Sequence, residues 1–465
     1  MNAEIVRQQF QQGQLDACAI AALYAQGKIT PSAFVDACLS AAEQSSSIFI
    51  TLTPQRARAE AAAATSRWQQ GAPLSALDGI PLAWKDLFNL AATRTTAGSA
   101  TRNNVMLEQQ DAALVAQLTQ AGMVTIGKTN LSEFAFSGLG INPAFGTPLL
   151  DSNHATQHVP GGSSSGSARA VAAGLACFAM GTDTAGSIRI PAAFNGITGY
   201  RASRQRYNDL GVFPLAASLD TLGPLCRSVR DARALDEILC GTTHELAAKP
   251  RFVADPILLD HADSAVRANG YHCLALLTAA GYAVEFRQIS AFHQALQWIA
   301  THGWPGAIEA YQLHAALLNS PQAEKMDPFI RSRLLASGQL NPTLLSDFLR
   351  QRANWQQALQ NELDGAVLIT PTVNHTAPLY APLTADAKAF AATNAATLRL
   401  TMPGSLLDMP GVALPSGVAD NGLFTSLLFS LPRGEDRRLL RAAQTAADVL
   451  APGNIARAEF SATQP

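Results

Sequence analysis

The chain has 465 residues and a formal net charge of −2, with 33 Lys and Arg against 35 Asp and Glu. Its residues are 48% hydrophobic and only 15% charged, where about 25% charged is usual for soluble proteins, so intrinsic disorder and a coiled coil are excluded. Because no long run of like charges is present, the sequence lacks the electrostatic signature of a nucleic-acid or membrane-surface protein, and small ligands of little charge fit it better.

The first half of the chain predicts a helical layer followed by an α/β core. Residues 1–70 have helical patterns, with one helix after the N-terminal signal Thr30-Pro31-Ser32 and a second, Ala-rich one from Pro54. From 71 to 249, short apolar strands alternate with helical stretches, which is typical of a sheet covered on both faces. We expect helices at 33–44, 54–70 and 111–121 and strands at 80–84 and 123–126.

The second half predicts an insertion and then a return to the core. Strand signals become sparse at 250–363, a helix-rich variable insertion, whereas 364–465 has strands and a closing helix that Pro452-Gly453 stops. We expect helices at 264–280, 291–300, 344–361 and 435–450 and strands at 366–370 and 424–430. The predicted fold is therefore α/β, with one core assembled from both ends of the chain.

The cysteines and the N-terminus favour a reducing compartment. Six widely scattered cysteines without a C-x-x-C pair argue against a zinc site or a disulfide framework. Residues 1–14 lack the apolar segment of a signal peptide, and the longest apolar run, 170–181, is far short of the roughly 20 residues that span a bilayer. We expect a soluble, cytoplasmic protein with these buried thiols: Cys18, Cys38, Cys177, Cys226, Cys240 and Cys273.

Residues 122–129, Gly-Met-Val-Thr-Ile-Gly-Lys-Thr, match the G-x-x-x-x-G-K-[ST] phosphate-loop pattern. A phosphate loop needs a strand before its first glycine and a flexible turn after it. Here a predicted helix precedes Gly122, and the residues between the two glycines are themselves the predicted strand. We therefore predict a strand and a turn at this place, and no nucleotide site.

Residues 162–166 match the G-x-S-x-G nucleophile elbow centred on Ser164. An elbow needs a hydrophobic strand running into it, whereas 154–160 is polar and ends in proline. His154 and His158 lie in that polar stretch, and we expect them to have loop or hydrogen-bonding roles instead of forming a histidine triad. We also expect none of the nine histidines to bind a metal.

Residues 160–201 form one unit, PGGSSSGSARAVAAGLACFAMGTDTAGSIRIPAAFNGITGYR. A glycine- and serine-rich turn leads into a buried helix expected at 167–178, and a second turn of small residues, 181–186, precedes Ser187. The block resembles the signature of the amidase signature family, whose members use a serine nucleophile, a second serine held by a cis peptide, and a lysine. Further family motifs match at 127–134 and 218–224, and the resemblance covers nearly the whole chain, weakening between about 250 and 365.

The resemblance implies the residues of the site. In the family the bridging serine follows a double glycine and the nucleophile lies 24 residues later, which matches Ser163 and Ser187 here. The family's lysine follows a Gly-Ile-Pro turn at the end of a strand, which matches Lys85. The implied fold has a central mixed sheet. The implied site comprises the catalytic residues Lys85, Ser163 and Ser187, an oxyanion hole from Thr184, Ala185, Gly186 and Ser187, and support from Gly162, Asp183 and Arg189.

Amide hydrolysis needs a deprotonated nucleophile, a protonated leaving amine and a stabilised oxyanion. A serine hydroxyl both donates and accepts, so Ser163 can pass a proton between Lys85 and Ser187. Lys85 must then start neutral, which requires desolvation to lower its pKa far from about 10.4. Its apolar approach at 80–84 is consistent with burial, and we expect no metal and no cofactor.

Several residues depart from the family pattern or allow two interpretations. Ala185 stands where glycine is commoner, and together with Ser165 it resembles the allophanate-hydrolase-like branch. Asp183 and Arg189 either brace the turn before the nucleophile or form a surface ion pair. The segment 200–206 carries three arginines, which either bind a carboxylate or lie in solvent. They are Arg201, Arg204 and Arg206.

The sequence thus predicts an amidase, a hydrolase of linear C–N bonds other than peptide bonds. It would cleave a small amide or carbamoyl compound through an acyl-enzyme on Ser187 and release ammonia or an amine. One alternative is the glutaminase-type A subunit of a tRNA-dependent amidotransferase, which needs partner subunits. Another is an aryl or medium-chain amidase. Aromatic residues of the insertion are available to hold the larger acyl group: Trp298, Trp304, Tyr311 and Phe329. We expect a small-molecule partner, no nucleic acid and no membrane, and leave open a homodimer.

Overall fold

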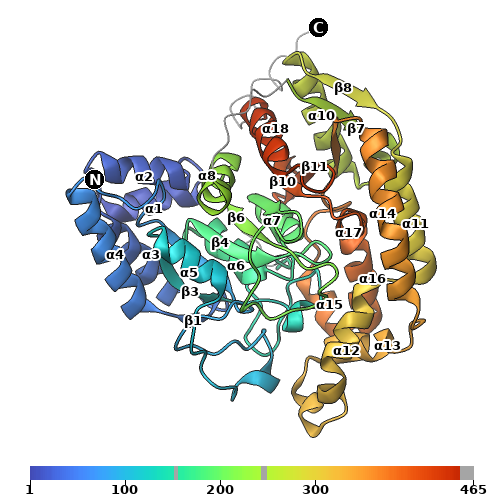
Figure 1. The fold of residues 1–465 in the computed structure, drawn as a ribbon, viewed down its shortest axis with the longest axis horizontal. Helices are drawn as coiled ribbons and strands as arrows, with labels where there is room; N and C mark the ends of the chain where they lie inside the picture. Colours follow the sequence, from blue (N-terminus) through green and yellow to red (C-terminus); the bar gives the residue numbers. More distant parts are fainter. Residues whose placement is uncertain (151–155, 242–248, 451–465) are drawn as a thin grey trace.

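The computed structural model describes residues 1–150, 156–241 and 249–450. Its strands are β1 (Phe49–Leu52), β2 (Pro81–Lys85), β3 (Val124–Thr129), β4 (Phe178–Thr182), β5 (Thr198–Arg201), β6 (Leu222–Cys226), β7 (Arg251–Ala254), β8 (Ala283–Phe286), β9 (Val367–Pro371), β10 (Gly411–Val418) and β11 (Phe424–Ser430). They form one mixed sheet covered by helices (Figure 1). The predicted α/β fold is confirmed.

The order of the strands shows how the two ends of the chain build one core. It is β1-β3-β2-β4-β6-β5-β10-β11-β9-β7-β8, so the first and last parts of the chain meet where β5 pairs with β10. Strand β2 lies parallel to β3 and β4, whereas successive strands of this order from β4 to β9 pair antiparallel. Strand β7 is parallel to both β9 and β8.

Among the described residues, eight helices accompany the first six strands. They are α1 (Ala3–Gln11), α2 (Ala17–Ala25), α3 (Pro31–Glu43), α4 (Pro54–Gln69), α5 (Ala113–Gln120), α6 (Ser165–Ala172), α7 (Arg189–Asn195) and α8 (Val229–Cys240), with short 3-10 turns η1 (Ala100–Arg102) and η2 (Glu133–Ala135). Local caps fix the predicted starts in the N-terminal layer. The Thr30 side chain accepts from the N–H of Ala33 (3.2 Å), and prolines occupy the first turns of α3 and α4.

Ten helices follow in the described part of the second half. They are α9 (Pro256–Asp260), α10 (Ser264–Ala279), α11 (Ser290–His302), α12 (Gly306–Leu318), α13 (Pro328–Ser337), α14 (Leu344–Leu363), α15 (Tyr380–Ala385), α16 (Ala387–Leu398), α17 (Thr401–Leu406) and α18 (Asp436–Val449), with η3 (Pro321–Lys325). The helices expected at 264–280, 291–300, 344–361 and 435–450 are confirmed to within a few residues. Pro452-Gly453, expected to stop the last one, lie outside the described residues.

The division into domains at 70, 249 and 363 stays a prediction. The single sheet nevertheless contains strands from all four of the expected segments. Strand β1, from the N-terminal layer, pairs antiparallel with β3. Strands β7 and β8, from the expected helical insertion, extend the sheet beyond β9. Strands β7 and β8 are only four residues long, which is too short for an alternation of polar and apolar residues to be recognised in the sequence.

The helix expected at 167–178 is wrong in its second half. Helix α6 ends at Ala172, Gly174 takes a left-handed φ of 67°, and β4 begins at Phe178. Residues 178–182 then pair with β2 and β6. A short apolar run fits a buried helix or a buried strand equally well, and here pairing across the sheet decides.

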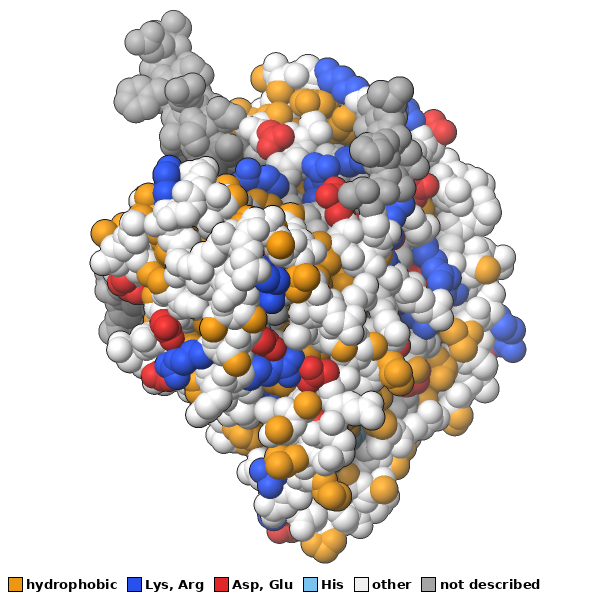
Figure 2. Space-filling model, turned by 60° about the vertical axis from the view of Figure 1, so that its left-hand side comes forward, with side chains coloured by type: hydrophobic (Ala, Val, Ile, Leu, Met, Phe, Trp, Pro, Cys, Tyr) orange, Lys and Arg blue, Asp and Glu red, His pale blue; other side chains and the backbone are white. Residues whose placement is uncertain are grey.

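The distribution of charge on the surface and the burial of the cysteines can be compared with what the sequence predicts. On the face drawn in Figure 2, basic and acidic side chains are scattered among neutral ones. No helix among the described residues combines the length and apolar character that crossing a bilayer requires. The six cysteines all lie in described parts of the chain and are free; four are buried, as expected, whereas Cys18 and Cys240 are half-buried.

Candidate active site

Lys85 ends β2 and is completely buried, with 0% of its surface exposed. Its Nζ lies 2.7 Å from Ser163 Oγ and 2.8 Å from Thr182 Oγ1. Burial lowers the pKa of Lys85 to about 7, and the charges of Asp183 and Asp220 only partly oppose this shift. The predicted burial is confirmed, and near neutral pH a large share of this amine is unprotonated and able to accept a proton.

The serine turn, residues 161–164, lies between Lys85 and residue 187. The Gly162–Ser163 peptide is cis, as predicted, and the N–H of Gly162 donates to the carbonyl of Gly138 (2.8 Å). The N–H of Ser164 donates to the carbonyl of Ser187 (3.2 Å). The structure therefore joins Lys85 to Ser163 and fixes residue 187 beside the turn through its backbone. The Ser187 side chain, in a residue 4% exposed, has no hydrogen-bond partner among the described residues.

The turn at 184–187 has backbone donors to spare. None of its four N–H groups donates to an acceptor among the described residues. Its carbonyls are engaged: that of Ala185 accepts from Thr401 Oγ1 (2.5 Å), and that of Gly186 from the N–H of Ile190 (2.8 Å). Gly186 has φ 140° and packs so closely against Thr401 that a side chain there would clash. A row of unpaired N–H groups is what an oxyanion requires.

Asp183 and Arg189 form a fully buried pair beneath this turn. Arg189 donates to Asp183 through Nη2 (2.8 Å) and Nε (3.0 Å), and the N–H of Ile188 donates to the same carboxylate (3.1 Å). Burial raises the pKa of Asp183, but the charges of Arg189 and Arg201 outweigh it and lower the pKa to about 2. The surface ion pair considered as an alternative is wrong, because both side chains are at most 1% exposed.

A family model described as Amidase matches residues 32–440 of this chain. The chain belongs to the amidase family. It is 31% identical over 432 residues to 2-amino-5-chloromuconic acid deaminase of Comamonas testosteroni, a match that covers 88% of this chain and 91% of that protein. A solved structure described as an amidase has a TM-score of 0.82 and 31% identity, and the match covers 94% of this chain and 100% of the other.

A second kind of amidase-family relative is similar over a shorter segment. The chain is 44% identical over 193 residues to the A subunit of glutamyl-tRNA(Gln) amidotransferase from Acinetobacter baumannii. That match spans 42% of this chain and 38% of the relative's length. The solved structure of the same amidotransferase component from Thermotoga maritima matches with a TM-score of 0.65 at 25% identity, covering 81% of this chain and 84% of that one.

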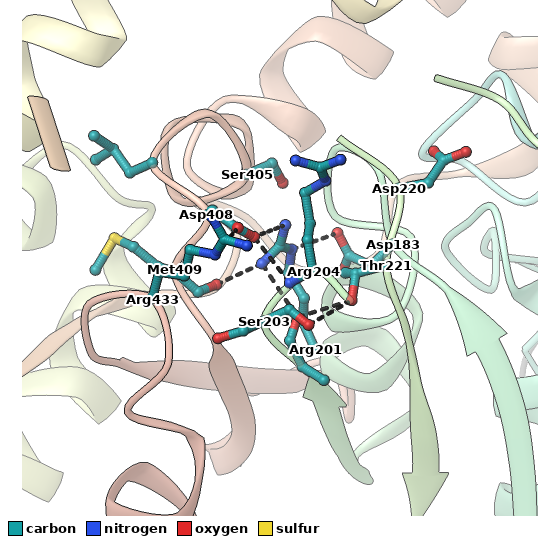
Figure 3. Close-up of polar contacts among 12 residues, drawn as sticks. Asp183, Arg201, Ser203, Arg204, Asp220, Thr221, Ser405, Asp408, Met409 and Arg433 are labelled. Carbon is teal, nitrogen blue, oxygen red and sulfur yellow. Dashed lines mark hydrogen bonds and ion pairs between the residues drawn. The ribbon is translucent and has the colours of Figure 1, made fainter. Parts of the chain in front are cut away.

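Two of the three arginines of 200–206 bind carboxylates of the chain itself. Figure 3 shows Arg201 between Asp183 and Asp408, at 3.6 Å from each carboxylate, and its Nη1 donates to the carbonyl of Met409 (2.7 Å). Arg204 is half-buried and donates to the carbonyl of Ala217. In a separate pair, Arg206 Nη2 lies 2.6 Å from Asp236 Oδ2. The interpretation that these arginines lie in solvent is therefore wrong for Arg201 and Arg206, since carboxylates of the chain itself bind them.

The phosphate-loop match forms a turn at Gly122 and then β3 from Val124 to Thr129, as predicted from the order of helix and strand. Lys128 is fully buried and its Nζ lies 2.6 Å from Asp86 Oδ1. The elbow match also lacks the geometry of a nucleophile, because Ser164 is 0% exposed and its Oγ donates to the carbonyl of Thr182 (3.4 Å). Neither motif presents its key side chain to a ligand.

His158, which precedes the serine turn, has no hydrogen bond or ion pair with Lys85, Ser163 or Ser187 in the described part of the chain. His158 forms isolated β-bridges with Leu150 and Leu379, whereas His154 lies outside the described residues. They are four residues apart, the spacing of metal pairs on helices, but residues 156–158 are not helical. The structure thus gives His158 the loop role expected of it.

Two further residues of the site were missed by the sequence analysis. Thr182 is the second hydrogen-bond partner of Lys85, and Asp220 accepts from Thr184 Oγ1 (2.6 Å). Burial raises the pKa of Asp220 to about 6, although three hydrogen bonds oppose the shift. The sequence could have indicated Thr182, because this residue lies at the start of the small-residue turn before Ser187. It was missed because the apolar run before it predicts a helix, whereas the structure has β4 there. Asp220 belongs to the matched motif at 218–224, where no role was assigned to it.

Proposed function

We propose that this chain is an amidohydrolase that cleaves the C–N bond of a small amide or carbamoyl compound through an acyl-enzyme on Ser187. The observation that carries the proposal is the contact between Lys85 Nζ and Ser163 Oγ (2.7 Å), made by a lysine whose burial lowers its pKa to about 7. Such an amine serves as a general base near neutral pH. The serine that it contacts, Ser163, is followed by Ser164, whose N–H donates to the carbonyl of Ser187.

In the proposed first step, Ser187 Oγ attacks the carbonyl carbon of the amide. The hydroxyl proton passes to Ser163 Oγ, which gives its own proton to Lys85 Nζ. Negative charge gathers on the carbonyl oxygen, and the unpaired N–H groups of residues 184–187 are placed to stabilise it. The buried pair of Asp183 and Arg189 keeps this turn in shape without touching the substrate.

In the proposed second step, the proton returns by the same route. Protonated Lys85 donates through Ser163 to the leaving nitrogen, so the C–N bond breaks and ammonia or an amine departs. A water molecule then attacks the acyl-enzyme and gives a proton to the neutral lysine through Ser163. The protonated lysine returns this proton through Ser163 to Ser187 Oγ as the bond between that oxygen and the acyl carbon breaks, so the carboxylic acid departs and the free enzyme is restored.

The proposed substrate class is a small, polar amide. Its support is the resemblance of Ala185 and Ser165 to the allophanate-hydrolase-like branch, and the name of the Comamonas testosteroni relative, which describes a small acid as substrate. Of the two residues only Ala185, half-buried at the 184–187 turn, is in a position to meet a substrate, since Ser165 is 0% exposed.

The alternative of an aryl or medium-chain substrate relies on four aromatic residues of the variable segment, all of which are half-buried. Trp298 packs against Trp355 at 5.6 Å between ring centroids, and Phe329 against Phe390 at 5.1 Å. Trp304 and Tyr311 are half-buried at the edge of the apolar cluster against which Ala185 also packs. Phe329 packs at the edge of the same cluster, so these three are the aromatic side chains of the variable segment that share it with Ala185.

The amidotransferase component remains a second candidate, because the match to that relative is 44% identical over 193 residues. Against it stands the 31% match to a deaminase over 91% of that protein's length. A purified single chain that releases ammonia from small amides supports the leading proposal. Release of ammonia from glutamine only in the presence of partner subunits supports the second.

Two measurements test the leading proposal. A fluorophosphonate adduct mapped by mass spectrometry should lie on Ser187, and an adduct on Ser164 would overturn the assignment. In a screen of amides, ureas and anilides, kcat/KM should favour the small carbamoyl amides. A preference of more than about tenfold for a hexanoyl amide or an anilide would instead indicate a dedicated hydrophobic site, since one methylene contributes only about 1 kcal/mol.

A further inference from the structure

Asp220 places a carboxylate beside the turn at 184–187. The N–H of Asp183 donates to the carbonyl of Thr221 (2.8 Å), which extends the antiparallel pairing of β4 with β6 by one residue. One residue further along, Thr184 Oγ1 donates to Asp220 Oδ1 (2.6 Å). A side-chain hydrogen bond therefore continues the pairing of the two strands into the turn that carries the unpaired N–H groups.

The carboxylate of Asp220 is itself held in place by the backbone. Its Oδ2 accepts from the N–H of Leu215 (2.8 Å) and from the N–H of Ala216 (3.0 Å). The backbone N–H of Asp220 donates to the carbonyl of Ala216 (2.8 Å). Both oxygens are thus used, and the hydroxyl of Thr184 donates to an ionisable acceptor whose position is fixed.

Asp220 carries a charge that no basic side chain neutralises directly. Among the described residues it forms no ion pair with a lysine or an arginine, and its carboxylate accepts only from the groups named above. Figure 3 draws no contact between Asp220 and the arginines around Arg201. Asp183, by contrast, is paired with Arg189 at 2.8 Å. Asp220 is therefore a carboxylate that remains available as a counter-charge.

A small cavity connects this carboxylate with the surroundings of Lys85. The cavity, about 90 Å³ in volume, has both Asp220 and Thr182 in its wall, and Thr182 Oγ1 lies 2.8 Å from Lys85 Nζ. The carboxylate and the second hydroxyl partner of the lysine therefore face the same space. Two charges, those of Asp183 and Asp220, oppose the lowering of the pKa of Lys85 by burial.

We propose that Asp220 is a positioning residue for the reaction on Ser187, which holds the 184–187 turn through Thr184 and stabilises by its charge the protonated Lys85 that the first step forms. A buried cation is costly unless a counter-charge is near, and the first step creates such a cation. The inference rests on the proposed amidohydrolase function, because both roles are exerted on the transition state. We therefore expect changes in kcat more than in KM.

One variant tests the hold on the turn alone. Thr184→Val removes the hydroxyl and leaves the charge of Asp220 and its bonds to the backbone in place. We expect kcat to fall by about tenfold or more and KM to change by less than about threefold, because a misplaced turn stabilises the oxyanion less. Thr184→Ser, which restores the hydroxyl, should recover most of the loss. A wild-type kcat in Thr184→Val would overturn the proposal, and this variant keeps it testable even if changes at Asp220 prevent folding.

A second variant tests the charge alone. In Asp220→Asn the amide oxygen can accept from the N–H groups of residues 215 and 216 while the NH₂ group donates to Thr184 Oγ1, so the shape is kept. In the wild type, the acid limb of kcat/KM should lie near the pKa of Lys85, about 7, where Asp220, with a pKa of about 6, is mostly ionised. Removing its negative charge should lower the pKa of Lys85 further and move this limb to lower pH by about 0.5 unit or more.

The other charged groups near these two residues stay the same in both proteins. They are Asp183, which acts on Lys85, and Glu309, which acts on Asp220. Asp209→Asn is the matched control, since Asp209 is an exposed carboxylate in the wall of the same cavity and should leave kcat and the acid limb unchanged. An acid limb that does not move in Asp220→Asn, or that moves equally in Asp209→Asn, would overturn the proposal.

The rate at which a fluorophosphonate labels Ser187, measured against pH, separates this proposal from the proposed function, because it needs no amide. If the wild type hydrolyses no amide but the acid limb of labelling moves in Asp220→Asn, the proposed function is wrong and the role of Asp220 stands. If amides are hydrolysed but neither labelling nor kcat responds to Asp220→Asn and Thr184→Val, the role of Asp220 is wrong and the proposed function stands.

Discussion

Two fully buried lysines lie on neighbouring parallel strands, Lys85 on β2 and Lys128 on β3. Burial lowers the pKa of both. Lys85 contacts two hydroxyls, whereas Lys128 lies 2.6 Å from the carboxylate of Asp86, whose charge opposes the effect of burial. The direct partner, and not burial alone, therefore separates a lysine that can accept a proton from one that serves as a fixed cation.

The largest effect is expected on catalysis, when Lys85 is replaced. Lys85→Ala should lower kcat by about 10²-fold or more, because it removes the group proposed to take the Ser187 proton. Steady-state kinetics on a variant with a native circular dichroism spectrum measures this. A loss of less than about tenfold would move the base elsewhere.

On the Lys128 side the expected loss is in stability. Lys128→Met leaves Asp86 buried without its cation, which should cost about 3–5 kcal/mol of unfolding free energy in urea denaturation. Adding Asp86→Asn should restore part of it, since the amide carries no charge. Catalysis by the folded fraction should fall far less than in Lys85→Ala. If Lys128→Met is as stable as the wild type, the ion pair has no structural role.

The low pKa of Lys85 also predicts a dependence of stability on pH. In the unfolded chain this amine is protonated below about pH 10.5, and in the folded chain only below about 7. Between these values unfolding takes up a proton, so stability from this residue should rise with pH by about 1.4 kcal/mol per unit. Below about 7 both states are protonated and the slope vanishes.

The difference in unfolding free energy between Lys85→Met and the wild type isolates this residue from all other titrating groups. Methionine has no such slope, so its advantage over the wild type should shrink steadily from pH 7 to pH 9 in urea denaturation. A difference that stays constant over this range would show that Lys85 is protonated in the folded protein.

The smallest expected effect concerns the second hydroxyl partner of Lys85. Thr182→Val removes the acceptor 2.8 Å from Nζ and should lower kcat/KM by about 3- to 10-fold, the equivalent of one hydrogen bond. Thr182→Ser keeps the hydroxyl and serves as the control, with activity near that of the wild type. A loss in Thr182→Ser but not in Thr182→Val, which keeps the methyl group, would point to the methyl group instead of the hydrogen bond.

Local patterns were enough for much of the fold. The structure has the predicted helix start at Thr30-Pro31, where a cap is followed by a proline. It also has the strand predicted at 424–430, which consists of mixed apolar residues. Strand β4 was missed because Phe178–Thr182 is short and apolar, which suits a helix or a strand equally. Its state depends on partners in β2 and β6, which lie far away along the chain.

The sequence by itself determined which residues are candidates for the chemistry. Three short motifs carry them: the glycine and serine turn around Ser163, the turn of small residues before Ser187, and the Gly-Ile-Pro turn before Lys85. Each turn depends on the residue types of its immediate neighbours, so it can be recognised in the sequence. The same local information excluded the phosphate loop at 122–129, because the order of helix and strand around it was wrong.

Only the tertiary structure decided which charges are paired. Arg201 meets Asp408, Arg206 meets Asp236, Lys128 meets Asp86, and Lys85 meets the hydroxyls of Ser163 and Thr182. The physical reason is that a side chain's pKa and free binding capacity depend on desolvation and on groups within a few ångströms, and folding brings those groups from distant parts of the chain.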